Sequence, residues 1–103
     1  MTSRGVDASS TDPVEIHDRP DRGRYEASID GVVAGFVQYR LEGDRITFVH
    51  TEADPAFKGS HVGTKLARYV LDDARARGLR VRPDCPFIRR YIGRHPDDQD
   101  LVV

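Results

Sequence analysis

The dipeptide Asp30-Gly31 limits what this chain can fold into more than any other feature of its sequence. It separates two runs in which apolar and polar residues alternate, residues 25–29 and 32–41. A two-residue turn of type I′ needs positive φ at both of its positions, and Asp-Gly adopts that conformation readily. The two runs therefore predict an antiparallel hairpin, with Gly35 as a candidate β-bulge in its second strand.

The sequence on either side extends this hairpin. The tripeptide Glu42-Gly43-Asp44 predicts a second tight turn, and residues 45–50 predict a third strand. Before the hairpin, residues 14–17 predict a short first strand and residues 19–23 predict a turn. Consecutive antiparallel strands form a meander, one face of which is free to pack against a helix.

A helical pattern follows in the second half of the chain, and Gly78 stands where such a helix commonly ends in a left-handed residue. The apolar stripe of this helix comprises Val62, Leu66, Ala67, Val70, Leu71 and Ala74.

The last part of the chain predicts three short elements. Residues 79–82 predict a strand, Pro86 opens a short helix that runs to Gly93, and residues 101–103 predict a packed extension. The predicted fold class is therefore α/β (α+β), with a mainly antiparallel sheet, one long helix and a short C-terminal helix.

Length and composition limit the class of protein. A chain of 103 residues corresponds to one domain, which we expect over residues 14–103, after a polar tail over 1–13 that is predicted to be disordered. One cysteine excludes an internal disulfide and a Cys-rich zinc site, and no metal is expected. The chain has no apolar run of about 18 residues and no signal segment, so we expect a cytoplasmic protein without a membrane partner.

Charge is distributed unevenly along the chain. Residues 1–57 hold 6 Lys or Arg against 11 Asp or Glu, a sum of −5, and residues 58–94 hold 10 against 3, a sum of +7. A cationic segment in a chain of net charge −1 favours a discrete anionic ligand. The alternative is a solvated face that acidic neighbours balance. Nucleic acid is disfavoured as a partner, because only Tyr69, Phe87 and Tyr91 offer stacking rings in that segment.

The loop before the long helix is the first candidate site. Gly59 and Gly63 flank the predicted helix start, where backbone N–H groups have no partner within the helix and bind phosphate. Lys58 adds a positive charge. A purely structural role is the alternative, because many helices begin beside glycine. A nucleotide-triphosphatase loop is excluded, because the order is Gly63-Thr64-Lys65 instead of Gly-Lys-Ser/Thr.

Four features together carry a family resemblance: His50-Thr51 at a strand end, the loop Lys58–Gly63, the segment 83–92 (PDCPFIRRYI) and the dipeptide His95-Pro96. With them, residues 24–102 resemble the GCN5-related N-acetyltransferases, in particular their small single-domain NATD-like branch. The loop of that family reads Arg/Gln-x-x-Gly-x-Gly/Ala and cradles the pyrophosphate of acetyl-CoA.

The resemblance implies acetyl-CoA as co-substrate. Its pantetheine would follow the strand before the loop, at Thr51, Glu52 and Ala53. Its pyrophosphate would bind the loop, which comprises Lys58, Gly59, Ser60, His61, Val62, Gly63 and Thr64. Lys58 keeps the charge of the family's arginine without its planar fork. His61 replaces the middle glycine, which partly obstructs approach of the pyrophosphate to the backbone unless the torsions of His61 stay helical.

Two residues are candidate general bases. His50 lies at the end of the predicted third strand, and an imidazole suits proton removal near neutral pH. Glu52 lies two residues further on and points to the same face of an extended chain. The alternative for His50 is a strand histidine that is bonded to a neighbouring carbonyl.

Cys85 is a candidate nucleophile. It stands before the helix that starts at Pro86, and a helix N-terminus beside Arg89 and Arg90 favours a thiolate. This permits a covalent acyl-enzyme, whereas direct transfer is what the resemblance implies. The alternative is a small, buried, apolar side chain.

The sequence thus predicts an N-acetyltransferase that moves an acetyl group from acetyl-CoA to an amine, directly or through Cys85. The acceptor is expected to be a small amine or a basic peptide if the acidic residues of 1–57 line its side of the site. A non-catalytic CoA-binding or protein-interaction module is the alternative, because so short a chain lacks the N-terminal helices that often shape the acceptor site in the family.

Overall fold

The computed structural model describes residues 13–103, whose strands form one five-stranded sheet in the order β2-β3-β4-β5-β6. The strands are β2 (Val14–Arg19), β3 (Arg24–Ile29), β4 (Val32–Glu42), β5 (Arg45–Ala53) and β6 (Arg80–Pro83). Neighbours are antiparallel from β2 to β5, and β6 is parallel to β5. The expected fold class, with a mainly antiparallel sheet, is confirmed.

The turns between the strands follow the sequence closely. Asp30 and Gly31 have φ of 51° and 80°, as a type I′ turn requires, and Gly43 has φ of 61°. A 3-10 helix, Pro20–Arg22, occupies the expected turn between the first two strands. The prediction that the third strand ends at residue 50 is wrong, because β5 runs to Ala53 with partners on β4 throughout.

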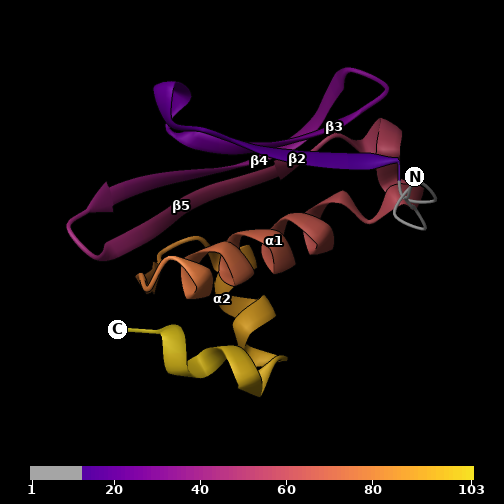
Figure 1. The fold of residues 1–103 in the computed structure, drawn as a ribbon. Helices are drawn as coiled ribbons and strands as arrows, with labels where there is room; N and C mark the ends of the chain where they lie inside the picture. The colour runs from indigo at the N-terminus through magenta and orange to yellow at the C-terminus, as the bar shows by residue number, and fades with distance from the viewer. Residues whose placement is uncertain (1–12) are drawn as a thin grey trace, which may run out of the picture.

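Two helices accompany the sheet, α1 (Val62–Ala76) and α2 (Pro86–Gly93). Helix α1 lies along one face of the sheet, and α2 follows below it (Figure 1). Gly78 has φ of 69° just after α1, as expected of a residue that ends a helix. The chain closes with a 3-10 helix, Pro96–Leu101, and Val102 forms a parallel bridge with Val81 of β6.

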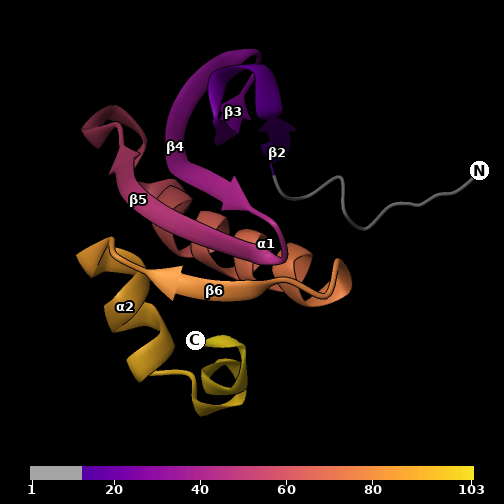
Figure 2. The same cartoon turned by 90° about the vertical axis from the view of Figure 1, so that its left-hand side faces the viewer.

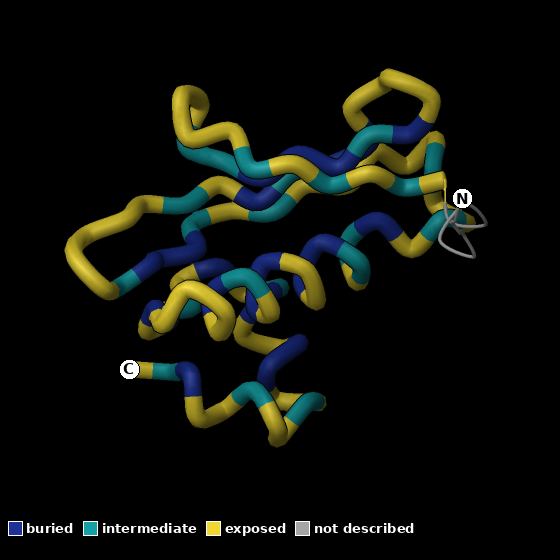
Figure 3. The backbone as a smooth tube through the Cα atoms, in the orientation of Figure 1, coloured by how far each residue is buried: buried dark blue, intermediate teal, exposed yellow. Residues whose placement is uncertain are grey.

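The core lies between α1 and the sheet, where buried residues of both elements face each other (Figure 3). All six apolar residues predicted for the stripe of α1 are buried. The largest side chains opposite them are Tyr25, Val37, Ile46, Phe48 and Val81. None of the helices in residues 13–103 is long and apolar enough to cross a membrane.

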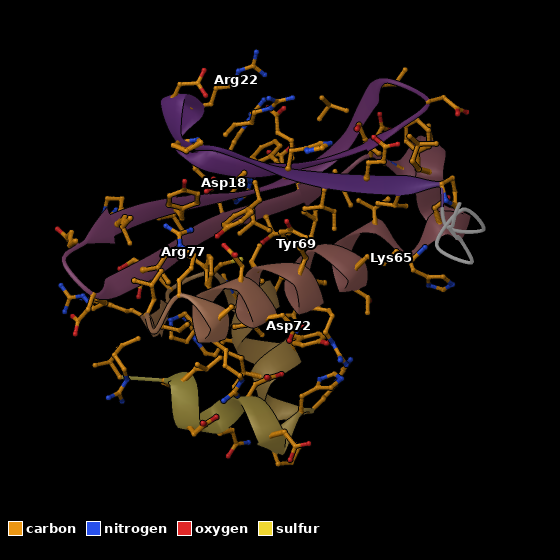
Figure 4. All side chains as sticks on the ribbon, viewed as in Figure 1. Asp18, Arg22, Lys65, Tyr69, Asp72 and Arg77 are labelled. Carbon is orange, nitrogen blue, oxygen red and sulfur yellow. The ribbon has the colours of Figure 1, made fainter. Side chains whose placement is uncertain are left out.

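A polar cluster ties the sheet to the end of α1 (Figure 4). The hydroxyl of Tyr25 donates to Asp73 at 2.5 Å, and that of Tyr39 donates to Asp18 at 2.6 Å. Arg77 pairs with both carboxylates, at 3.1 Å from Asp73 and 3.6 Å from Asp18. Burial, reinforced by these carboxylates, raises the pKa of both tyrosines, so the two hydroxyls stay protonated donors.

The face of the sheet opposite α1 carries no α-helix of residues 13–103 (Figures 1 and 2). We call it the open face. It is polar, and its Glu26 carboxylate is covered by Arg24 at 2.7 Å, Arg22 at 3.0 Å and Arg19 at 3.7 Å. Burial acts to raise the pKa of Glu26, but hydrogen bonds and charge from Arg24 and Arg22 outweigh it and hold the pKa below its ordinary value.

Two irregularities in β4 and β5 shape the end of the sheet. Gln38 pairs with His50 whereas Tyr39 pairs with Phe48, so Val49 is an extra residue in β5. The bulge expected at Gly35 falls one residue earlier, because Ser28 pairs with Val33 and Ala27 with Gly35.

Gly35 instead allows neighbouring backbone and side-chain atoms to lie close to β4. A Cβ atom there would lie 2.7 Å from the carbonyl oxygen of Glu52 and 2.8 Å from Cγ1 of Val62. Since real Cβ atoms do not approach other atoms so closely, only glycine lets β4, β5 and the start of α1 meet at this point.

Candidate functional site

The parallel strands β5 and β6 part at the centre of the molecule. Their register ends where Phe48 pairs with Pro83, whereas β5 continues to Ala53. The backbone N–H of Cys85 donates to the carbonyl of Phe48 at 2.8 Å, and the chain then turns into α2. Residues 49–53 therefore extend beyond the last pair with β6 and have no strand partner on that side, and we call this place the gap between β5 and β6.

Cys85 lies on the helix side of this gap. Its Sγ atom is 3.2 Å from Oγ1 of Thr51, and the residue is 2% exposed. The guanidinium of Arg89 donates to the carbonyls of Pro83 and Asp84 and is thus held by backbone. Cys85 is thus as buried as a core residue, although it lies beside the gap.

His50 and Glu52 lie on the open face. Nε2 of His50 is 2.9 Å from Oε2 of Glu52, and the side chains are 51% and 63% exposed. The ring of Phe36 lies 6.1 Å from the imidazole, between centroids, and the guanidinium of Arg24 lies 4.5 Å above the Phe36 ring. The two predicted bases therefore form one hydrogen-bonded pair that solvent reaches.

The four candidates thus fall on two sides of one strand. Thr51 pairs with Val37, a core residue, and so points toward the helices, whereas His50 and Glu52 point away from them. A group that entered the gap between β5 and β6 would meet Cys85 from one side and His50 from the other. No sequence pattern signalled this division, because it depends on the extra residue Val49.

The first turn of α1 has the donors of an anion site. The first intrahelical bond runs from the N–H of Lys65 to the carbonyl of His61, so the N–H groups of Val62, Gly63 and Thr64 have no acceptor within the helix. The side chain of Val62 is 3% exposed and points into the core, which leaves its backbone for a ligand. A 3-10 helix, Pro55–Ser60, precedes this turn in place of the expected loop.

The loop glycines differ in what surrounds them. A Cβ atom on Gly59 would meet nothing within 4 Å, whereas one on Gly63 would lie 3.0 Å from the ring of Phe87. Gly63 therefore has a packing role. Lys58 and Ser60 lie on the 3-10 helix, and Lys58 is exposed.

His61 has a left-handed backbone, with φ of 56° and ψ of 41°, so the condition of helical torsions is not met, and its side chain partly obstructs approach to the backbone of the loop. The chain must reverse between the 3-10 helix and α1, and the family's glycine adopts such a conformation without strain. Histidine accepts the same torsions at a cost, and its side chain makes no capping bond.

A cavity of about 420 Å³ opens beside the first turn of α1. It is lined by Thr64, Phe87, Arg90, Tyr91, Arg94 and His95. Within residues 13–103, the side chains of Arg90 and Arg94 make no ion pair, so two cationic groups face this space near the helix N-terminus. Arg94 is a residue that no sequence motif singled out, although its spacing of four residues from Arg90 places it on the same side as Arg90 at the C-terminal end of α2.

Another cavity, of about 810 Å³, lies between β2 and α1 and includes Lys65, Tyr69 and Asp72, all labelled in Figure 4. It contains none of the candidate catalytic residues. Among residues 13–103, no three His, Cys, Asp or Glu side chains are grouped as a metal site would need.

Comparison with known proteins identifies the family of this chain. A family described as GCN5-related N-acetyl-transferase matches residues 24–101. No protein of curated function matches significantly. The NMR solution structure of a GCN5-like protein from Staphylococcus aureus superposes with a TM-score of 0.68 at 22% identity, over 88% of this chain and 89% of that one. At that identity the likeness concerns the fold, while the family match covers most of the sequence. The chain therefore belongs to the GCN5-related N-acetyltransferases.

Proposed function

We propose that the protein transfers an acetyl group from acetyl-CoA directly to an amine, in a site that spans the gap between β5 and β6. The observation that carries the proposal is the placement of the His50–Glu52 pair on the open face, with the anion-binding start of α1 on the helix side. The two substrates can then approach from opposite faces and meet at residues 49–53.

The chain's own residues fit acetyl-CoA at three points. The N–H groups of Val62, Gly63 and Thr64, with Lys58 nearby in sequence, suit the pyrophosphate. The cavity with Arg90 and Arg94 suits the remaining phosphate of the nucleotide. The backbone of residues 51–53, which has no β6 partner, supplies amides for pantetheine and for the thioester oxygen.

His50 is the proposed general base. In the neutral tautomer that carries hydrogen on Nε2, it donates to Glu52 and keeps the lone pair of Nδ1 for a proton from the incoming ammonium. The Glu52 carboxylate orients the ring and stabilises the imidazolium that forms. The free amine then attacks the thioester carbon, so that the C–N bond forms as the C–S bond breaks, and the CoA thiolate leaves and takes up the proton that the acylated nitrogen releases.

Covalent transfer through Cys85 is the alternative route. The thiol would attack the thioester carbon, give its proton to the departing CoA sulfur, and later release the acetyl group to the amine. The contact with Thr51 and the exposure of only 2% support a structural role for Cys85, so we place direct transfer first. Intact mass after incubation with acetyl-CoA alone tests this, since an added acetyl group lost in Cys85→Ala would establish the covalent route.

A titration with acetyl-CoA tests the binding half of the proposal. The protein should gain about 2.7 kcal/mol of stability at a concentration 100 times the Kd, seen as a rise in Tm. The double variant R90Q/R94Q should weaken binding several-fold, whereas R19Q, on the open face, should not. An unchanged Tm at millimolar acetyl-CoA would contradict the proposal.

Turnover separates an enzyme from a binding module. Release of CoA thiol in the presence of a panel of primary amines should exceed hydrolysis without amine. Binding of acetyl-CoA without transfer to any amine would support the non-catalytic alternative.

A further inference from the structure

Along β4 and β5, the side chains on the open face change from negative at one end to positive at the other. Phe36 pairs with Glu52, Gln38 with His50, and Arg40 with Thr47, so a carboxylate, an imidazole and a guanidinium follow one another along the sheet. Glu52 and Arg40 thus lie on opposite sides of His50.

Two arginines lie at the guanidinium end of this series. Thr47 pairs with Arg40 on β4 and with Arg82 on β6, so two arginines flank one residue on the same face. Within residues 13–103, the side chain of Arg40 makes no ion pair, and Arg82 is 56% exposed and pairs with Asp84 at 3.0 Å. Thr47 itself is only 1% exposed, so an anion would lie above it, where it would meet the guanidinium of Arg40 and share that of Arg82 with Asp84.

One row beyond, Arg45 adds a further cation. It pairs with Glu42 at 3.2 Å, and its Nε atom is buried without a hydrogen-bond partner among the described residues. This end of the open face has more guanidinium donors than its own carboxylates satisfy.

The carboxylate end lies beside a cavity of about 340 Å³, whose lining includes Glu52, Asp54 and Arg24. The charge of Arg24 is engaged by Glu26, at 2.7 Å. Glu52 and Asp54 therefore leave this end net negative, which favours an ammonium group.

We propose that the acceptor is an amine that also carries an anionic group, with its nitrogen at His50–Glu52 and its carboxylate or phosphate at Arg40 and Arg82. This assignment rests on the proposed acetyl transfer. Two residues along a strand span about 6.6 Å, the reach of an extended chain of four or five carbons. A diamine or a basic peptide would place its second cation among guanidiniums, which repel it.

Three acceptors of matched length test the assignment: 5-aminopentanoate, its neutral amide, and 1,5-diaminopentane, with 3-aminopropyl phosphate to distinguish phosphate from carboxylate. The kcat/KM for transfer from acetyl-CoA should be highest for the anionic acceptors and lowest for the diamine. In R40Q, the ratio of kcat/KM for 5-aminopentanoate to that for its amide should fall about tenfold, the effect of losing one charge-assisted contact.

Arg19→Gln is the matched control, because Arg19 lies on the open face at the far edge of the sheet, on β2. It should leave that ratio unchanged. A preference for 1,5-diaminopentane, or an equal loss for all acceptors in R40Q, would overturn the acceptor assignment and leave acetyl transfer standing. Absence of transfer to any of the four, with no rise in Tm from acetyl-CoA, would overturn the proposed function itself and the assignment with it.

Discussion

Nε2 of His50 lies 2.9 Å from Oε2 of Glu52, and both side chains point away from Cys85, which the backbone joins to the same strand at Phe48. The strand thus separates a solvent-accessible base from a buried thiol. This separation makes the two proposed routes distinguishable by substitution.

Replacement of His50 by Gln should lower kcat by about 10²- to 10⁴-fold, the usual contribution of general-base catalysis. The KM for acetyl-CoA should change little, because His50 faces away from the anion site. Steady-state assays in which each substrate is varied in turn measure both constants. Glu52→Gln should cost less, because the imidazole remains. A variant H50Q with unaltered kcat would exclude His50 as the base.

Glu26→Gln should destabilise the protein by about 2 kcal/mol at pH 7, since hydrogen bonds to a charged group are lost. The folded pKa of Glu26 lies below its ordinary value, so its carboxylate stabilises the fold above pH of about 4.3, and that contribution is lost as pH falls through the folded pKa. Urea unfolding between pH 7 and pH 2 should show the two proteins converging in acid. Glu15→Gln, with a side chain that is 75% exposed, should track the wild type throughout.

Gly35→Ala should cost about 2 kcal/mol, because the new Cβ would lie 2.7 Å from the backbone oxygen of Glu52. For a domain of this size that is a fall in Tm of roughly 10 °C. Gly59→Ala is the control, since a Cβ there meets nothing within 4 Å. Equal melting temperatures for the two variants would show that β4 moves away from β5 freely.

His61→Gly should raise stability by about 1 kcal/mol, because φ of 56° costs a histidine backbone energy that glycine does not lose. Thermal melting should show a gain of roughly 5 °C, and the shift caused by acetyl-CoA should persist. His61→Ala separates the two causes: it removes the imidazole and keeps the strain, so it should not melt above the wild type. A higher Tm in H61A would mean that the imidazole itself, and not the torsion, is unfavourable.

Much of the fold could be predicted from local chemistry. The turns at Asp30-Gly31 and Gly43 have positive φ, which their residue types favour, and the apolar residues of α1 recur at helical spacing. These elements therefore follow from short stretches of sequence. The end of β5 could not be predicted in this way. Thr51, Glu52 and Ala53 are extended because β4 offers them partners, and that pairing is not local.

The site was predictable in its parts and not in its arrangement. The residues of the loop and the pair of bases could be named from spacing and from the family resemblance. The torsion of His61 depends on how the 3-10 helix meets α1, and the cavity with Arg90 and Arg94 depends on how α2 packs beside α1. Both are tertiary properties that no window of sequence contains.

The single extra residue Val49 shifts the alternation by which successive side chains of β5 point to the two faces of the sheet. If the strand alternated strictly from Arg45 and Val49 were paired like its neighbours, His50 would point to the helices with Phe48, and Thr51 would point to solvent. The bulge at Val49 therefore decides which side chains each substrate meets. A relative that keeps every residue of this strand but pairs them without the bulge would present an inverted site, whereas one that lacks Val49 altogether would keep the same faces, so alignments across this strand must be compared by the face that each residue occupies.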